Sequence, residues 1–127
     1  MLPKLELTKM AHAMAAHAGA RMGVIARNVA NADTPGFKAQ DLPDFAKTYY
    51  DGPGAIRATR AGHLLGGGDG RAALPERLAL PAAPNGNSVS IEGEMMRAAE
   101  TRQQHDMALS IYTKTSDILK TALGRGR

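Results

Sequence analysis

The chain has 127 residues, enough for one domain, and its few aromatic side chains (two Phe, three Tyr and no Trp) favour close helix packing over a thick core. It has no cysteine, which excludes disulfides, thiolate metal sites and thiol nucleophiles. The formal net charge of +4 would suit an anionic partner, but acidic and basic side chains are mixed along the chain, so the basic arm or recognition helix of a nucleic-acid-binding protein is missing.

The first predicted element is an amphipathic helix over about residues 5–32. Apolar or small side chains recur at steps of three and four residues, the spacing of one helix face. These positions are Leu7, Ala11, Met14, Ala18, Met22, Ile25, Val29 and Ala32. The larger side chains of this row are expected to form a helix-packing seam, namely Leu7, Met14, Met22 and Ile25. Gly19 and Gly23 either permit close approach of another helix or are simply tolerated.

The same segment has some features of a secretory signal peptide, because Lys4 and Lys9 precede an alanine-rich run that contains A-x-A sequences. The run is alanine with histidine rather than leucine, however, and cleavage would cut the helical stripe in half. We therefore expect no cleaved signal peptide. The longest runs without charged side chains, residues 10–20 and 78–91, are too short to span a membrane, so no direct membrane span is predicted.

A turn is predicted at residues 33–37. Pro35 cannot continue the helix and restricts Thr34 before it, while Pro35-Gly36 is the central pair that a type II turn requires. Phe37 then directs the returning chain toward an apolar environment. Asn28 and Asn31, three residues apart, share a face and can bond the last helix carbonyls or a neighbouring subunit.

Residues 38–87 are predicted to be a loop-rich middle. Glycine and proline are frequent, as in GPG at 52–54 and GGGDG at 66–70, and no helical or strand period is sustained. Short extended pieces are expected at most at 45–50 and 56–65.

A second long helix is predicted over about residues 89–123. Ser88 or Ser90 can cap it, and Glu92 and Glu94 in the first turn complement its dipole. A heptad row follows at Met95, Ala98, Arg102, His105, Leu109, Tyr112, Ser116, Leu119 and Leu123. The apolar side chains expected to make this packing seam are Met95, Leu109, Tyr112 and Leu119. A second row lies beside it at Ala108, Ile111, Thr115, Ile118 and Ala122, and a stripe this wide indicates more than one helical neighbour.

Polar side chains within the predicted seam have two interpretations. At Arg102 and His105 either the seam is partly solvated or these residues specify the register between helices, as polar seam residues can.

No catalytic or metal site is predicted. His12 and His17 are five residues apart, so they do not share the helix face that two zinc-binding imidazoles need. The GGGDG segment lacks the lysine and hydroxyl of a phosphate-binding loop. We expect no cofactor, no metal and no enzymatic activity.

The expected fold class is an all-α core in which the long N- and C-terminal helices pair as a coiled-coil-like hairpin, with the loop-rich middle projecting from it. The whole chain, residues 1–127, is expected to form a single domain.

Three segments carry a resemblance to a known family. RNVANADTPGFKAQDL at 27–42 resembles the segment after the N-terminal helix of bacterial flagellar rod and hook proteins. ATRAGHL at 58–64 and NGNSVSIEGEM at 85–95 are similar to later segments of the same family, in the same order. The TPGF form followed by DLPDF at 41–45 looks most like the B-type proximal rod subunits. Arg27, Val29 and His105 depart from the usual pattern.

The resemblance implies a structural subunit of the proximal rod of the flagellar basal body. Its terminal helices would polymerise with copies of itself and other rod proteins, and it would contact the basal adaptor, the export gate and the inner-membrane ring. It would be exported by the flagellar type III apparatus to the periplasmic rod. Phe45 and Tyr49 resemble a short export-gate motif, although tyrosine in the second position is a departure.

Three alternatives remain. A C-type rod or hook protein is the alternative within the family. A solitary coiled-coil adaptor would share the heptads without needing the TPGF turn, and a small basic nucleic-acid-binding protein would share only the charge.

Overall fold

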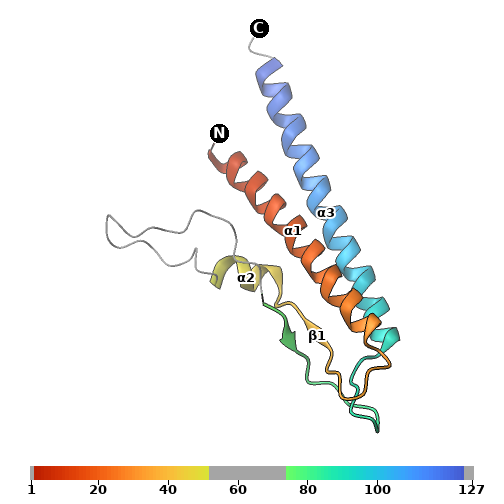
Figure 1. Ribbon diagram of the computed structural model, residues 1–127. Coiled ribbons are helices and arrows are strands. Elements are labelled where there is room, and N and C mark those ends of the chain that lie inside the picture. The colour runs from red at the N-terminus through yellow and green to blue at the C-terminus, as the bar shows by residue number, and fades with distance from the viewer. Residues whose placement is uncertain (1, 52–73, 125–127) are drawn as a thin grey trace, which may run out of the picture.

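A computed structural model of the chain describes residues 2–51 and 74–124. Its elements, in chain order, are helix α1 (Leu2–Ala30), strand β1 (Gln40–Asp41), helix α2 (Phe45–Asp51), strand β2 (Glu76–Arg77) and helix α3 (Ile91–Gly124). The two long helices lie side by side and antiparallel, with the chain termini near one end (Figure 1). This arrangement confirms the predicted all-α hairpin with only short strands between its helices. The other end of the hairpin, where α1 finishes and α3 begins, is called the closed end below.

The seam between α1 and α3 is built from small side chains at seven-residue intervals. On α1 the buried apolar residues are Ala11, Ala18 and Ile25, and on α3 the buried residues are Glu94, Thr101, Ala108 and Thr115. The hydroxyls of Thr101 and Thr115 each donate to the carbonyl four residues earlier in their own helix, at 2.7 and 2.8 Å. Because those hydroxyls are satisfied within α3, threonine can lie in the seam without an unpaired polar atom.

The structure corrects the predicted position of this seam within one chain. Among the predicted seam residues, Ile25 is buried and Met14 and Leu119 are half-buried. Leu7, Met22, Met95 and Leu109 are exposed. Tyr112 is also exposed, but its ring lies 5.4 Å from that of His12 on α1, so it does contact the partner helix. The row that faces α1 begins at Glu94, one residue before Met95, and includes Ala108 and Thr115 from the second predicted row. Small side chains allow close approach of the helices, and the orientation of α3 also brings Glu94 to Asn28 on α1.

The helix ends fall within a few residues of their predicted places. At the end of α1, Asn31 and Ala32 donate to carbonyls three residues back, so the last turn tightens and the helix stops at Ala30. At the start of α3, the hydroxyl of Ser90 accepts from the backbone N–H of Gly93 at 3.3 Å. Of the two predicted capping residues, Ser90 therefore caps the helix. Ser88 has another role at the closed end.

The middle segment differs from prediction at residues 45–50. An extended piece was expected there, but Phe45–Asp51 forms the short helix α2. The backbone N–H of Thr48 donates to the carbonyl of Asp44 at 2.9 Å, and Asp44 is a residue type suited to the position before a helix. The other predicted piece, residues 56–65, lies outside the described residues. β1 and β2 pair antiparallel, with Gln40 opposite Arg77 and Asp41 opposite Glu76.

The alanine seam generates a stability prediction. We expect Ala108→Leu to lower the free energy of unfolding by about 1–3 kcal/mol, because a larger side chain must push the helices apart. The adjacent change Leu109→Ala is the control, since Leu109 is 46% exposed, and it should alter stability by about 0.5 kcal/mol or less. Urea titration followed by helical circular dichroism measures both. Equal effects of the two substitutions would contradict the assigned seam.

Candidate functional site

The predicted turn lies at the closed end of the hairpin and has the predicted geometry. The backbone N–H of Phe37 donates to the carbonyl of Thr34 at 3.2 Å, and Gly36 has φ +75°. A bond across four residues with positive φ at the third is the signature of a type II turn. Thr34, Pro35 and Gly36 are exposed, whereas Phe37 is half-buried. The type II turn is therefore confirmed.

A second turn packs against the first. Gly86, with φ +84°, donates its N–H to the carbonyl of Ala83 at 2.8 Å. Gly36 donates to the carbonyl of Asn85 at 3.0 Å, which joins the two turns directly. A Cβ added to Gly86 would lie 3.3 Å from the Cα of Gly36. Glycine at position 86 therefore satisfies both a left-handed backbone and a close approach of main chains.

Asn87 ties the start of the α3 segment to the end of α1. Its side-chain N–H groups donate to the carbonyls of Asn31 and Thr34 at 2.9 and 2.8 Å, and its side-chain oxygen accepts from the N–H of Val89 at 2.8 Å. The residue is only 4% exposed. These carbonyls lie beyond the last helical turn, and each also accepts from a backbone N–H, that of Thr34 or Phe37. Asn87 thus gives each of them a second donor.

The side-chain amide of Asn28 pairs with β1 in the way that a backbone peptide group would. Its side-chain oxygen accepts from the N–H of Gln40 at 3.1 Å, and its nitrogen donates to the carbonyl of Gln40 at 2.7 Å. This is the paired exchange that two residues make in an antiparallel ladder. The same nitrogen donates to Oε2 of Glu94 at 3.2 Å, so Asn28, 1% exposed, connects α1, β1 and α3.

The remaining polar residues of the closed end have more local partners. Asn31 donates from its side chain to the carbonyl of Arg27 at 2.8 Å, as predicted for a last-turn asparagine. Thr34 donates from its hydroxyl to Asn31 at 3.2 Å. Ser88 accepts from the N–H of Ala39 at 2.8 Å and donates its own N–H to the carbonyl of Phe37 at 3.0 Å.

A chain of alternating charges continues from Glu94 along one side of the hairpin. Glu94 is fully buried and pairs through Oε1 with Arg97, whose Nε lies 3.9 Å from Oδ2 of Asp41. Asp41 in turn accepts two bonds from Arg21, at 2.9 and 3.0 Å. Nη2 of Arg21 also lies 3.6 Å from Glu100. These ion pairs fasten β1 to both long helices.

The charge of Arg21 is reinforced by this arrangement. Its hydrogen bond with Asp41 raises its pKa above the ordinary value, and the attraction of Asp41, Glu100 and Asp44 acts in the same direction. Partial burial opposes the shift but does not reverse it. The arrangement therefore stabilises the cationic form that arginine already has at physiological pH.

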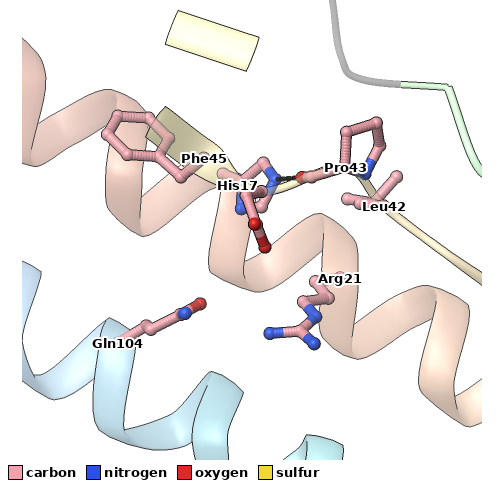
Figure 2. Close-up of a pocket in the computed structure, with 7 residues that line it drawn as sticks. His17, Arg21, Leu42, Pro43, Phe45 and Gln104 are labelled. Carbon is pink, nitrogen blue, oxygen red and sulfur yellow. Dashed lines mark hydrogen bonds between the residues drawn. The ribbon is translucent and has the colours of Figure 1, made fainter. Parts of the chain in front are cut away.

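Phe45 of the predicted export motif lies where α2 meets the hairpin (Figure 2). The ring nitrogen Nε2 of His17 donates to the carbonyl of Pro43 at 2.8 Å, and the rings of His17 and Phe45 are 5.7 Å apart at their centroids. The ring of Phe45 also lies 5.3 Å from that of Tyr49, one helical turn later. The segment is helical, so the expectation that these residues lie in a loop was wrong.

The hollow at this junction is too small for a ligand. It has a volume of about 10 Å³, roughly the space of one water, and lies between His17, Phe45 and Gln104. Over residues 2–51 and 74–124, no three His, Asp or Glu side chains are grouped as a metal site would require. No helix in the same ranges is long and apolar enough to cross a membrane.

The roles of several residues of the closed end were not predicted from the sequence. Asn87 was not singled out, Ser88 was considered only as a helix cap, and Glu94 only as a first-turn charge. One signal for Glu94 was available, because it precedes Thr101, Ala108 and Thr115 at steps of seven. A charged residue in an otherwise small, heptad-spaced row indicates a buried polar contact. No local pattern gives the partners of Asn87, which are more than fifty residues away.

The closed end generates a prediction about Asn87. We expect Asn87→Ala to lower the free energy of unfolding by about 1–3 kcal/mol, because two carbonyls lose their shared donor. Asn31→Ala removes two solvent-exposed bonds, one to the carbonyl of Arg27 and one from the hydroxyl of Thr34, and should cost about 0.5 kcal/mol or less. Thermal melts of both variants beside the parent test this ranking. It is refuted if Asn31→Ala proves the more damaging change.

Comparison with known proteins agrees with the turn and helix pattern. The sequence model of the flagella basal body rod protein family matches residues 11–38, which include the second half of α1 and the type II turn. The flagellar basal body rod protein FlgB of Cereibacter sphaeroides is 34% identical over 108 residues, covering 81% of this chain and 82% of that protein. FlgB of Agrobacterium fabrum is 29% identical over 118 residues, covering 84% of each. The chain belongs to the FlgB family of flagellar basal-body rod proteins.

Proposed function

We propose that the protein is a structural subunit of the proximal rod of the bacterial flagellar basal body and that it polymerises through its two long helices. One observation, on the surface of the hairpin, supports polymerisation through the two helices. A long apolar flank of α1 and α3 is left uncovered by the described part of the chain.

The two flanks of α3 differ in character. On one flank, Arg97 and Glu100 are engaged with β1 and α1 through the ion pairs of Asp41 and Arg21. The other flank carries a heptad row with large apolar side chains at Met95, Leu109 and Leu123, which are exposed by 67%, 46% and 68%. Arg102 and Ser116 lie between them in the same row. This row follows the buried row by one residue, about 100° around the helix. A neighbouring helix could therefore contact it without displacing the seam.

Further large apolar side chains are exposed on both helices. Those exposed on α1 include Leu5, Leu7, Met22 and Val29, and those on α3 include Ile91, Tyr112 and Ile118. Each large apolar side chain transferred from water into a packed interface contributes about 1.5–3 kcal/mol. The thin intramolecular seam offers much less burial, so contacts between subunits would supply much of the stability of the assembled helices.

An open helical assembly is the form that such contacts favour. When one surface of a subunit binds a different surface of the next copy, the contact repeats and builds a filament unless the rotation closes a ring. Copies of the chain and other rod proteins are therefore the partners that we propose for this surface. We also propose contacts with the basal adaptor, the export gate and the inner-membrane ring, on the strength of the family relationship.

A role other than assembly has little support in the described structure. The polar residues of the closed end bond one another and form no open reactive site. A C-type rod or hook protein, or a coiled-coil adaptor, would share the hairpin, but the FlgB relatives favour the proximal rod. We propose export by the flagellar type III apparatus without signal cleavage, since cleavage within the alanine-rich run would divide α1.

The apolar flank generates an assembly prediction. Leu109→Asp should leave the isolated chain folded as well as the parent, because Leu109 is not part of the intramolecular seam. In the rod the new carboxylate would be buried without a partner, at a cost on the order of several kcal/mol. We expect loss of motility in soft agar and loss of rods from isolated basal bodies.

Gln103→Asp is the matched control for that experiment, since it places the same charge on an exposed position of α3 away from the Met95, Leu109 and Leu123 row. It should swim normally. Normal motility of the Leu109→Asp strain would show that this flank is not an assembly surface.

We further propose that Phe45 and Tyr49 form the segment held by the export gate. Both rings lie on one side of α2, which is only seven residues long and therefore readily unfolds. Two large anchors on a short segment can supply most of the energy of docking into a small apolar pocket. The competing interpretation is that Phe45 serves only to pack against His17.

Phe45→Ala separates these two roles. If Phe45 docks at the gate, the variant should accumulate inside the cell and rod building should stall. Leu42→Ala is the control for packing, because Leu42 is 7% exposed in the same segment, and this variant should be secreted normally. Fractionation and immunoblotting measure secretion. Secretion of Phe45→Ala at the parental level would assign the residue to packing.

A further inference from the structure

The small side chains of the seam do not by themselves specify how α1 and α3 are aligned. Uncharged short or apolar side chains recur at steps of seven on both helices, so sliding one helix along the other by one heptad again brings compatible side chains together. The slip would move α3 by about 10 Å, because each helical residue rises about 1.5 Å. Its packing cost would be modest, since alanine and threonine bury little surface.

The connection between the helices does not fix the alignment by its length. α1 ends at Ala30 and α3 begins at Ile91, so the intervening chain is far longer than a tight helix-to-helix loop. The cost of closing a long loop changes only slowly with the separation of its ends. Some other contact must discriminate between the alignments.

The buried polar groups of the closed end do discriminate. In the observed alignment Glu94 accepts from Asn28 and pairs with Arg97, although it is fully buried. After a one-heptad slip, Thr101 would take its place beside Asn28. The bond between Asn28 and Glu94 would then be lost, and Asn28, buried against β1, would lack an acceptor for one N–H.

Asn87, in the segment that leads into α3, also restricts the alignment of the two helices. Its amide holds the carbonyls of Asn31 and Thr34 four residues before α3 begins. A shift of α3 would pull that amide away from both. Apolar contacts tolerate such a displacement, whereas hydrogen bonds depend steeply on distance and angle.

We infer that Asn28, Glu94 and Asn87 together set the register of the α1–α3 hairpin, while the alanine and threonine seam only holds the helices close. They are positioning residues, and the charged side chain of Glu94 is buried for alignment rather than for stability alone. The sequence had suggested Arg102 and His105 for this role. Arg102 is exposed and His105 half-buried, and neither makes the cross-helix bond that Glu94 makes.

Register determines which surface a neighbour would meet. A slip would displace the exposed Met95 and Leu109 row by about 10 Å relative to the apolar side chains of α1. This consequence for assembly rests on the proposed rod function. The register itself is a property of the single chain, so its test does not depend on that function.

The absence of cysteine allows spin labels to be placed on the two helices without background reaction. Labels at Lys9→Cys and Ala99→Cys occupy exposed positions on α1 and α3. Their distance is measured by double electron–electron resonance on the full chain in frozen sucrose solution, which favours the folded state. The parent should give one narrow distance distribution.

In the same labelled chain, Asn28→Leu, Glu94→Leu and Asn87→Ala together should produce a second population, with the axial separation of the labels shifted by about 10 Å. The helical dichroism should be retained. The seam control, Thr101→Ala with Thr115→Ala, alters two buried residues without touching the cluster and should keep one population.

A single native distance in the helical triple variant overturns the inference, as does a second population in the seam control. If the triple variant loses its helical signal, the Asn28→Leu and Glu94→Leu pair and Asn87→Ala alone are measured instead. A displaced population in either supports the assignment, and native distances alone in both refute it.

Discussion

The contact on which the structure depends is the buried amide of Asn28 between Gln40 and Glu94. One side chain completes the hydrogen bonding of a two-residue strand and meets a carboxylate on the opposite helix. Without it, β1 would have a single short partner strand, and a two-stranded ribbon of this length is not stable alone. The ion pair of Asp41 with Arg21 lies one residue along β1 from this contact and also holds the strand beside α1.

Turns, strand and helices therefore behave as one polar assembly at the closed end. The two glycine turns touch through the main chain, Asn87 bonds the carbonyls beyond α1, and Ser88 bonds the chain entering β1. Among the described residues, no buried side-chain nitrogen or oxygen lacks a partner. A network satisfied to this degree is rigid, and its rigidity explains how a chain with so little apolar core can hold a defined shape.

Sequence patterns predicted the helices well because spacing and capping are local properties. The type II turn followed from Pro35 and Gly36 alone, and α3 begins one residue after Ser90. Periodicity could not tell which of two adjacent rows faces the partner helix, so Met95 was assigned to the seam that Glu94 occupies. α2 was missed because a short helix has too few residues to display a period. The bond between Asn28 and Glu94 joins residues 66 apart, beyond the reach of any local pattern.

The narrow alanine and threonine seam has a thermodynamic consequence for a protein that works in an assembly. When a folded form binds neighbours and the unfolded form does not, its apparent stability rises with the concentration of those neighbours. The melting temperature of this chain would therefore depend on the protein concentration as well as on the sequence. The growing end of a filament would act as a template for the hairpin, and an unincorporated subunit would be the form most exposed to proteolysis.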